Sequence, residues 1–115
     1  MRDERVAKHA QEFIEEHHSV AVHIEDLCHA TGVGVRTLQR SFREYFDVTI
    51  MEHLKTVRLD AARRELLAMH PSEATVATIA LRNGLTHLGR FSVEFRERFG
   101  ESPRDMLATR AGHKS

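Results

Sequence analysis

Apolar residues recur at helical spacing along this chain, and two stretches of the pattern repeat one another. The stretch Ile24-x-x-Leu27-Cys28-x-x-x-Gly32-Val33 is followed, 52 residues later, by Val76-x-x-Ile79-Ala80-x-x-x-Gly84-Leu85. A second apolar stripe follows each glycine, formed by Leu38, Phe42 and Phe46 in the first copy and by Phe91, Phe95 and Phe99 in the second. Such spacing places each stripe on one helix face. Each copy therefore predicts a short helix, a turn and a longer helix.

The same periodicity predicts an all-α fold. The expected helices span about 4–18, 24–31, 35–46, 50–69, 76–83, 87–99 and 103–107, and no segment alternates as a strand would. Gly32 and Gly100 are expected to end helices in the left-handed conformation, and Thr49 with Glu52 forms a capping box that begins the longest helix. From Ala108 onward we expect a frayed polar tail.

The helix expected at 50–69 is apolar on two sides. One stripe comprises Leu54, Val57 and Ala61, and the other comprises Leu59, Ala62 and Leu66. A helix with two apolar stripes needs two packing partners. We therefore predict a single domain over 1–115, in which this helix links a lobe at about 4–48 to a lobe at about 74–107, with 108–115 as the tail.

Short helix, turn and longer helix together are typical of a helix-turn-helix, whose second helix can enter the major groove of DNA. Two such units make sequence-specific binding of double-stranded DNA the leading hypothesis. The two helices cross closely and favour a small residue at the contact. We therefore interpret Cys28, like Ala80, as a packing residue rather than a reactive thiol.

The helix at 35–46 carries the stronger candidate reading surface. Opposite its apolar side, which includes Val35, it presents Arg36, Thr37, Gln39, Arg40 and Arg43. Arginine can bond guanine through two hydrogen bonds and glutamine can bond adenine in the same way. We expect Arg36, Gln39 and Arg40 to face base edges, and Arg43, a turn further on, to face phosphate. The alternative is an ordinary solvated helix face.

The helix at 87–99 offers fewer reading side chains. Its apolar side includes Leu88, and its exposed side begins with His87, Gly89, Arg90, Val93 and Glu94. Arg90 is the main candidate for a base edge, Gly89 allows close approach to DNA, and Val93 suits a thymine methyl group.

Phosphate contacts are weaker predictions, made from position alone. The candidates are Arg82, Arg96 and Arg104, together with the helix starts at Ile24 and Val76. For Arg96 and Arg98, the alternative is that they balance Glu94 and Glu97.

Composition fits one small domain without a membrane span or a secretion signal. A single cysteine among 115 residues allows no internal disulfide, which favours the reducing cytoplasm. The seventeen basic and seventeen acidic residues cancel, although DNA-binding domains are usually basic. The acidic excess lies in residues 1–27, which hold three basic and seven acidic residues; residues 28–115 hold fourteen and ten, so the predicted reading helices lie in a net positive segment.

The nine histidines raise the question of a metal. They are scattered, and neither an HExxH pattern nor paired cysteines occur. No Ser, His and Asp set indicates a nucleophile. We expect no metal, no cofactor and no enzymatic activity.

From about Val20 to Leu107 the sequence resembles the DNA-binding domain of the AraC/XylS family of bacterial transcription regulators. The resemblance rests on Arg58-Leu59-x-Ala61-Ala62 with Leu66-Leu67, on Ile79-Ala80-x-x-x-Gly84, and on Phe91-Ser92-x-x-Phe95-Arg96-x-x-Phe99-Gly100-x-Ser102-Pro103. It implies seven helices in two helix-turn-helix lobes, joined by a long helix. Carried over by position, it implies reading by Arg36, Thr37, Gln39 and Arg40 in the first lobe and by His87, Gly89, Arg90 and Val93 in the second.

The sequence departs from the family pattern at three positions. Leu85 stands where phenylalanine is usual, Val93 where arginine is common, and Gly34 where a serine cap is frequent. The valine motivates an alternative, in which one lobe contacts RNA polymerase or a partner regulator instead of DNA. The family also commonly carries an N-terminal sensing or dimerisation domain, so we expect either a compact stand-alone member or, preferably, the C-terminal piece of a longer regulator.

Overall fold

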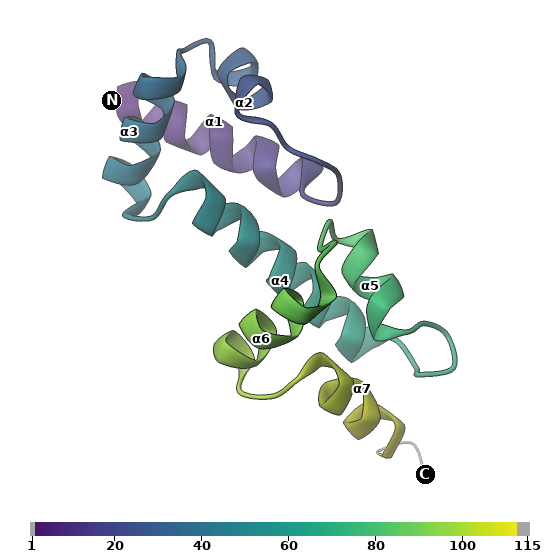
Figure 1. The fold of residues 1–115 in the computed structure, drawn as a ribbon. Helices are drawn as coiled ribbons and strands as arrows, with labels where there is room; N and C mark the ends of the chain where they lie inside the picture. The colour runs from purple at the N-terminus through teal and green to yellow at the C-terminus, as the bar shows by residue number, and fades with distance from the viewer. Residues whose placement is uncertain (1, 113–115) are drawn as a thin grey trace. The chain divides into compact units, whose positions relative to one another are not determined.

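The computed structural model describes the backbone of residues 2–112 and the side chains of residues 3–109. Over this range it is all-helical, with no strand, which confirms the predicted fold class. The helices are α1 (Arg2–His17), α2 (Ile24–Thr31), α3 (Val35–Phe46), α4 (Ile50–Ala68), α5 (Val76–Arg82), α6 (Leu88–Phe99) and α7 (Pro103–Gly112) (Figure 1).

The chain divides into two compact units, and the division falls inside α4, between Val57 and Arg58. Unit 1 contains α1, α2, α3 and the start of α4; unit 2 contains the rest of α4 with α5, α6 and α7. The two halves of the long helix thus belong to different units.

In unit 1, α2 and α3 pack against α1 and against each other (Figure 1). Their shared core includes Ile14 of α1, Leu27 of α2, and Leu38 and Phe42 of α3, and α4 adds Leu54. Cys28 is half-buried beside this core, in agreement with its interpretation as a packing residue.

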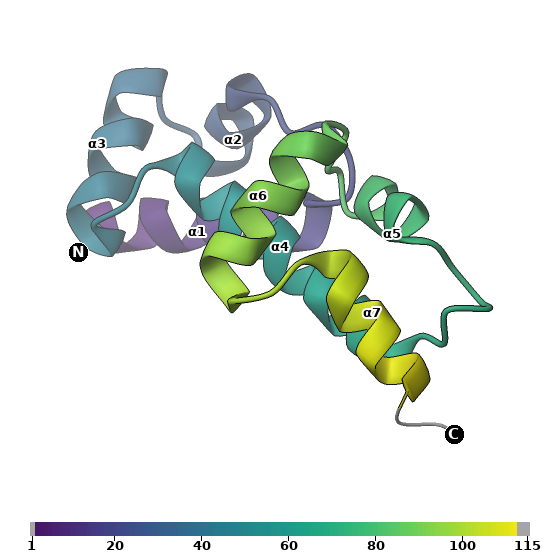
Figure 2. The ribbon, with the colours of Figure 1, turned by 60° about the horizontal axis from the view of Figure 1, so that its bottom comes forward.

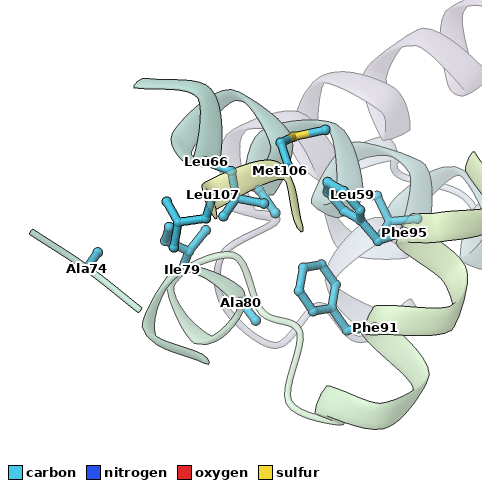
Figure 3. Close-up of a cluster of buried hydrophobic side chains, with 10 residues drawn as sticks. Leu59, Leu66, Ala74, Ile79, Ala80, Phe91, Phe95, Met106 and Leu107 are labelled. Carbon is cyan, nitrogen blue, oxygen red and sulfur yellow. The ribbon is translucent and has the colours of Figure 1, made fainter. Parts of the chain in front are cut away.

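In unit 2, α5, α6 and α7 contact one another, and both ribbon views show them close to the second half of α4 (Figures 1 and 2). The side chains that meet come from all four helices: Leu59 and Leu66 from α4, Ile79 from α5, Phe91 and Phe95 from α6, and Met106 and Leu107 from α7 (Figure 3). Each unit therefore has its own hydrophobic core.

The helix ends follow from local chemistry that the sequence displays. Thr49 Oγ1 accepts a hydrogen bond from the Glu52 N–H at 3.1 Å, and the Glu52 carboxylate accepts one from the Thr49 N–H at 3.3 Å. Gly32 and Gly100 adopt left-handed φ angles of 75° and 85°. These observations confirm the predicted capping box and both glycine caps.

Three details of the sequence prediction are wrong. The last helix continues to Gly112 instead of ending at Leu107, because residues 108–111 contain neither proline nor glycine and include two alanines and an arginine, which favour helix. Val35 and Leu88 are 44% and 43% exposed, although both were assigned to apolar sides. Each is the first residue of its helix and lies at the edge of the packed stripe.

Candidate nucleic-acid interface

The surface of α3 combines a buried side with an exposed polar side. Leu38, Ser41 and Phe42 are fully buried. Arg36, Gln39, Arg40 and Arg43 are all exposed, whereas Thr37 is half-buried and less accessible than predicted. Four of the five predicted polar side chains of this helix thus share one solvent-facing surface.

Aromatic packing fixes α3 in unit 1. The ring of Phe42 lies 4.9 Å from that of Phe46 and 5.5 Å from the imidazole of His53 in α4, measured between ring centroids. On the α1 side, the buried Ser41 hydroxyl donates to Asp3 at 2.7 Å. A rigid α3 holds its exposed side chains in a fixed register, as base recognition requires.

Asp3 also lies near a candidate reading residue. Its carboxylate oxygen is 3.9 Å from a guanidinium nitrogen of Arg40, whose side chain remains 55% exposed. An ion pair this long and this exposed contributes little. Arg40 is therefore accessible to an external acceptor.

The turn between α2 and α3 depends on glycine at one position. Gly32 has a φ of 75°, a backbone conformation that residues other than glycine adopt only at a cost in free energy. Gly34, the N-cap of α3, has an ordinary φ of −80° and supplies no capping side chain. A Cβ added at Gly34 would meet no atom within 4 Å, so a serine fits there.

In unit 2, the start of α6 presents a smaller polar surface. Gly89, Arg90 and Val93 are exposed, the last by 58%. His87 precedes the helix and caps it, since its Nδ1 accepts a hydrogen bond from the Arg90 N–H at 3.2 Å. That bond leaves the other ring nitrogen, Nε2, to carry the proton of the neutral imidazole and donate outward.

The arginines assigned to phosphate fall into two groups. Arg43, Arg96 and Arg104 are exposed. Arg82 is also exposed, but it donates to Glu65 of α4 at 3.2 Å. Arg98 pairs with Asp60 of α4 through contacts of 2.8 and 3.1 Å, and the sequence interpretation had not named this partner.

Asn83 is a structural residue that the sequence interpretation missed. It is 97% buried, and its amide donates to Glu65 at 3.0 Å and to the Ile79 carbonyl at 2.9 Å. Together with Arg82 it ties the end of α5 to α4. Its place directly before the turn glycine was the available signal, because asparagine is frequent at helix ends.

No three histidine, cysteine, aspartate or glutamate side chains gather as a metal site among the residues described. Nor does any described helix combine the length and apolar character that crossing a membrane requires.

The helix pairs α2–α3 and α5–α6 each form a short helix, a turn and a longer helix, which places this chain in the class of helix-turn-helix proteins. A family model described as "Helix-turn-helix domain" matches residues 27–109. The chain is 35% identical over 104 residues to the probable thc operon regulatory protein of Rhodococcus erythropolis. The aligned residues make up 90% of this chain and 31% of that protein. The chain thus spans about a third of the length of this curated relative.

Solved structures narrow the class to a family. A probable AraC family transcriptional regulator from Rhodopseudomonas palustris superposes with a TM-score of 0.83 at 30% identity, covering 91% of this chain and 96% of that one. The DNA-binding domain of AdpA, a global transcriptional factor solved in complex with a target DNA, gives a TM-score of 0.78 at 25% identity, with 95% of each chain covered. The chain belongs to the AraC family of helix-turn-helix transcription regulators, which confirms the resemblance.

Proposed function

We propose that this chain binds duplex DNA in a sequence-specific manner, as the DNA-binding part of a transcription regulator, with α3 and α6 as reading helices. The observation that carries the proposal is the exposed surface of α3, where Arg36, Gln39, Arg40 and Arg43 lie opposite a fully buried side. Arg36 and Arg40 suit guanine and Gln39 suits adenine, while Arg43 suits phosphate. Thr37, being half-buried, contributes less.

The second unit adds a narrower set of contacts. Arg90 binds a base edge, Val93 contacts a thymine methyl group, and Gly89 lets the backbone approach DNA. His87 donates from Nε2, because its Nδ1 is used in the cap. Arg96 and Arg104 bind phosphate, whereas Arg82 is held by Glu65 and has the lesser role.

When both units engage DNA, their reading helices occupy successive major grooves, about 34 Å apart. The R. erythropolis relative is named an operon regulatory protein, and the AdpA domain was solved with its target DNA. These names support operator binding by this chain. The alternative is that one unit contacts RNA polymerase or a partner regulator instead of DNA, and an N-terminal sensing or dimerisation domain is a further expected partner.

The test is a selection of bound duplexes from a random pool, followed by footprinting of the selected site over a range of salt concentrations. We expect an enriched sequence, a footprint near two helical turns, and binding that weakens steeply with salt as phosphates release counterions. A pool without enrichment overturns sequence-specific binding. A footprint near a single turn overturns engagement by both units and favours the alternative, in which unit 2 contacts a protein.

A further inference from the structure

Unit 1 contains a pocket of about 450 Å³ beside the exposed surface of α3. Its deeper wall is aliphatic, with Leu27, Ile50 and Leu54 each at least 93% buried. Its rim carries the exposed polar side chains of Gln39, Arg40 and Arg43. This volume lies within the range of pockets that hold small organic molecules, about 300–1,000 Å³.

We propose that this pocket binds a small amphiphilic carboxylate, whose apolar body lies against the aliphatic wall and whose carboxylate meets Arg40 and Arg43. The two arginines stand three residues apart on one helix face, so they can converge on a single anion. A guanidinium matches a carboxylate through paired hydrogen bonds and also stacks on flat apolar bodies. The aliphatic wall disfavours a nucleotide or a sugar phosphate, which would leave polar groups unbonded there.

Two acidic groups near the rim arginines, Asp3 beside Arg40 and Glu52 beside Arg43, are already engaged. Asp3 accepts the Ser41 hydroxyl at 2.7 Å and reaches Arg40 only at 3.9 Å. The Glu52 carboxylate accepts the Thr49 N–H, and hydrogen bonds from Thr49 lower its pKa, with a smaller contribution from Arg43. The arginines therefore keep donors for an incoming carboxylate.

The pocket shares side chains with the reading surface, which gives the ligand a regulatory role that rests on the proposed function. Gln39 and Arg40 line the pocket and are also the proposed base readers. A carboxylate that holds Arg40 withdraws it from DNA, so ligand and DNA compete. By linkage, each lowers the affinity of the other by the same factor.

The first experiment measures ligand binding without DNA. The probe is naphthoate, titrated by NMR or calorimetry, with naphthylmethanol as its neutral match and naphthylmethylammonium as its cationic match. A charge-assisted hydrogen bond changes the binding constant by a factor of about ten or more. We therefore expect naphthoate to bind at least tenfold more tightly than either match, and to change the NMR chemical shifts of Leu27 and Leu54. Equal binding of the three probes overturns the proposal.

Variants then locate the site. Val22 lines the pocket and Val20, two residues earlier, does not. Val22→Trp should abolish naphthoate binding while Val20→Trp keeps it, and Arg43→Gln should weaken naphthoate at least tenfold but leave naphthylmethanol unchanged. Retained binding by Val22→Trp places the probe elsewhere and overturns the assignment. If Val22→Trp does not fold, the comparison of naphthoate with naphthylmethanol binding by Arg43→Gln tests the pocket assignment independently. Equal weakening of both probes, or of neither, would overturn it.

A final titration separates this inference from the proposed function. Saturating naphthoate should weaken binding of the selected duplex at least tenfold, and naphthylmethanol should not. Undiminished DNA binding at saturation overturns the competition. If naphthoate binds as expected but no duplex is ever bound, the proposed function fails and the pocket assignment stands.

Discussion

At the scale of single residues, Arg40 is a proposed reading side chain that the structure leaves accessible. The carboxylate of Asp3 is 3.9 Å from its guanidinium, and the side chain is more than half exposed. We predict that Arg40→Ala costs about 1–3 kcal/mol on the selected site and relaxes base preference at one position. Arg5→Ala on the exposed side of α1 is the control and should leave base preference intact. Competition binding on matched and mismatched duplexes measures both, and an unchanged preference in Arg40→Ala removes this residue from the reading set.

Val93 tests whether the second unit faces DNA. Its side chain is 58% exposed on α6, where the family commonly has arginine. Val93→Arg should raise general DNA affinity and increase the slope of log affinity against log salt by about one, as expected for one added phosphate contact. Leu81→Arg, on an α5 position that is 56% exposed, is the matched control. Equal slopes in the two variants would mean that the added charge acts nonspecifically.

His53 gives unit 1 a dependence on pH. Its Nε2 is buried without a hydrogen-bond partner among the described residues, and the rings of Phe42 and Phe46 lie beside it. Burial lowers its pKa below the usual 6.5, while Glu15 acts weakly in the opposite direction. Between the folded and unfolded pKa values the unfolded chain binds more protons, so stability rises with pH there.

The stability that depends on neutral His53 is complete above about pH 6.5 and is lost as pH falls below that value. We predict that His53→Leu reduces the loss of urea stability between about pH 7 and about pH 5. His29→Leu, which removes an exposed histidine of α2, should retain that loss. An identical pH profile for His53→Leu and the unmodified chain would show that another group carries the dependence.

At the scale of elements, the turn of the first helix-turn-helix contains two glycines, Gly32 and Gly34, with different backbone requirements. Gly34→Ser should stabilise unit 1 by a few tenths of a kcal/mol, because serine caps α3 in space that is already open. Gly32→Ser should destabilise it by roughly 1 kcal/mol, since φ is 75° there. Thermal unfolding measures both, and the hypothesis is wrong if the two variants shift the midpoint in the same direction.

How far the sequence predicts each element depends on whether the decisive interaction is local. The bounds of α2 and α3 are predicted correctly because they depend on capping residues and apolar spacing, which are signals that lie within a few residues of each helix end. The pairing of Arg98 was not predicted, because its partner, Asp60, is 38 positions away and no local rule pairs them. The exposed row on α3 follows from period alone, whereas the pocket beside it requires Ile24, Ile50 and Leu54 to come together from two other segments.

At the scale of the whole molecule, the two hydrophobic cores share no residue and α4 contributes to both. Phe42 is fully buried in one and Phe91 is 99% buried in the other. Phe42→Ala should cost about 3–5 kcal/mol and should reduce amide protection in α1, α2 and α3 far more than in α5, α6 and α7. Phe91→Ala should instead reduce amide protection in α5, α6 and α7 far more than in α1, α2 and α3.

Native-state hydrogen exchange followed by NMR measures the protection of backbone amides in each helix separately. The informative amides are those of α4, since its residues before and after the Val57–Arg58 boundary pack into different cores. In each variant the protected half of α4 should be the half that belongs to the intact unit. Uniform loss of protection through all seven helices would show instead that the units unfold as one, and that α4 transmits the loss of either core to the other.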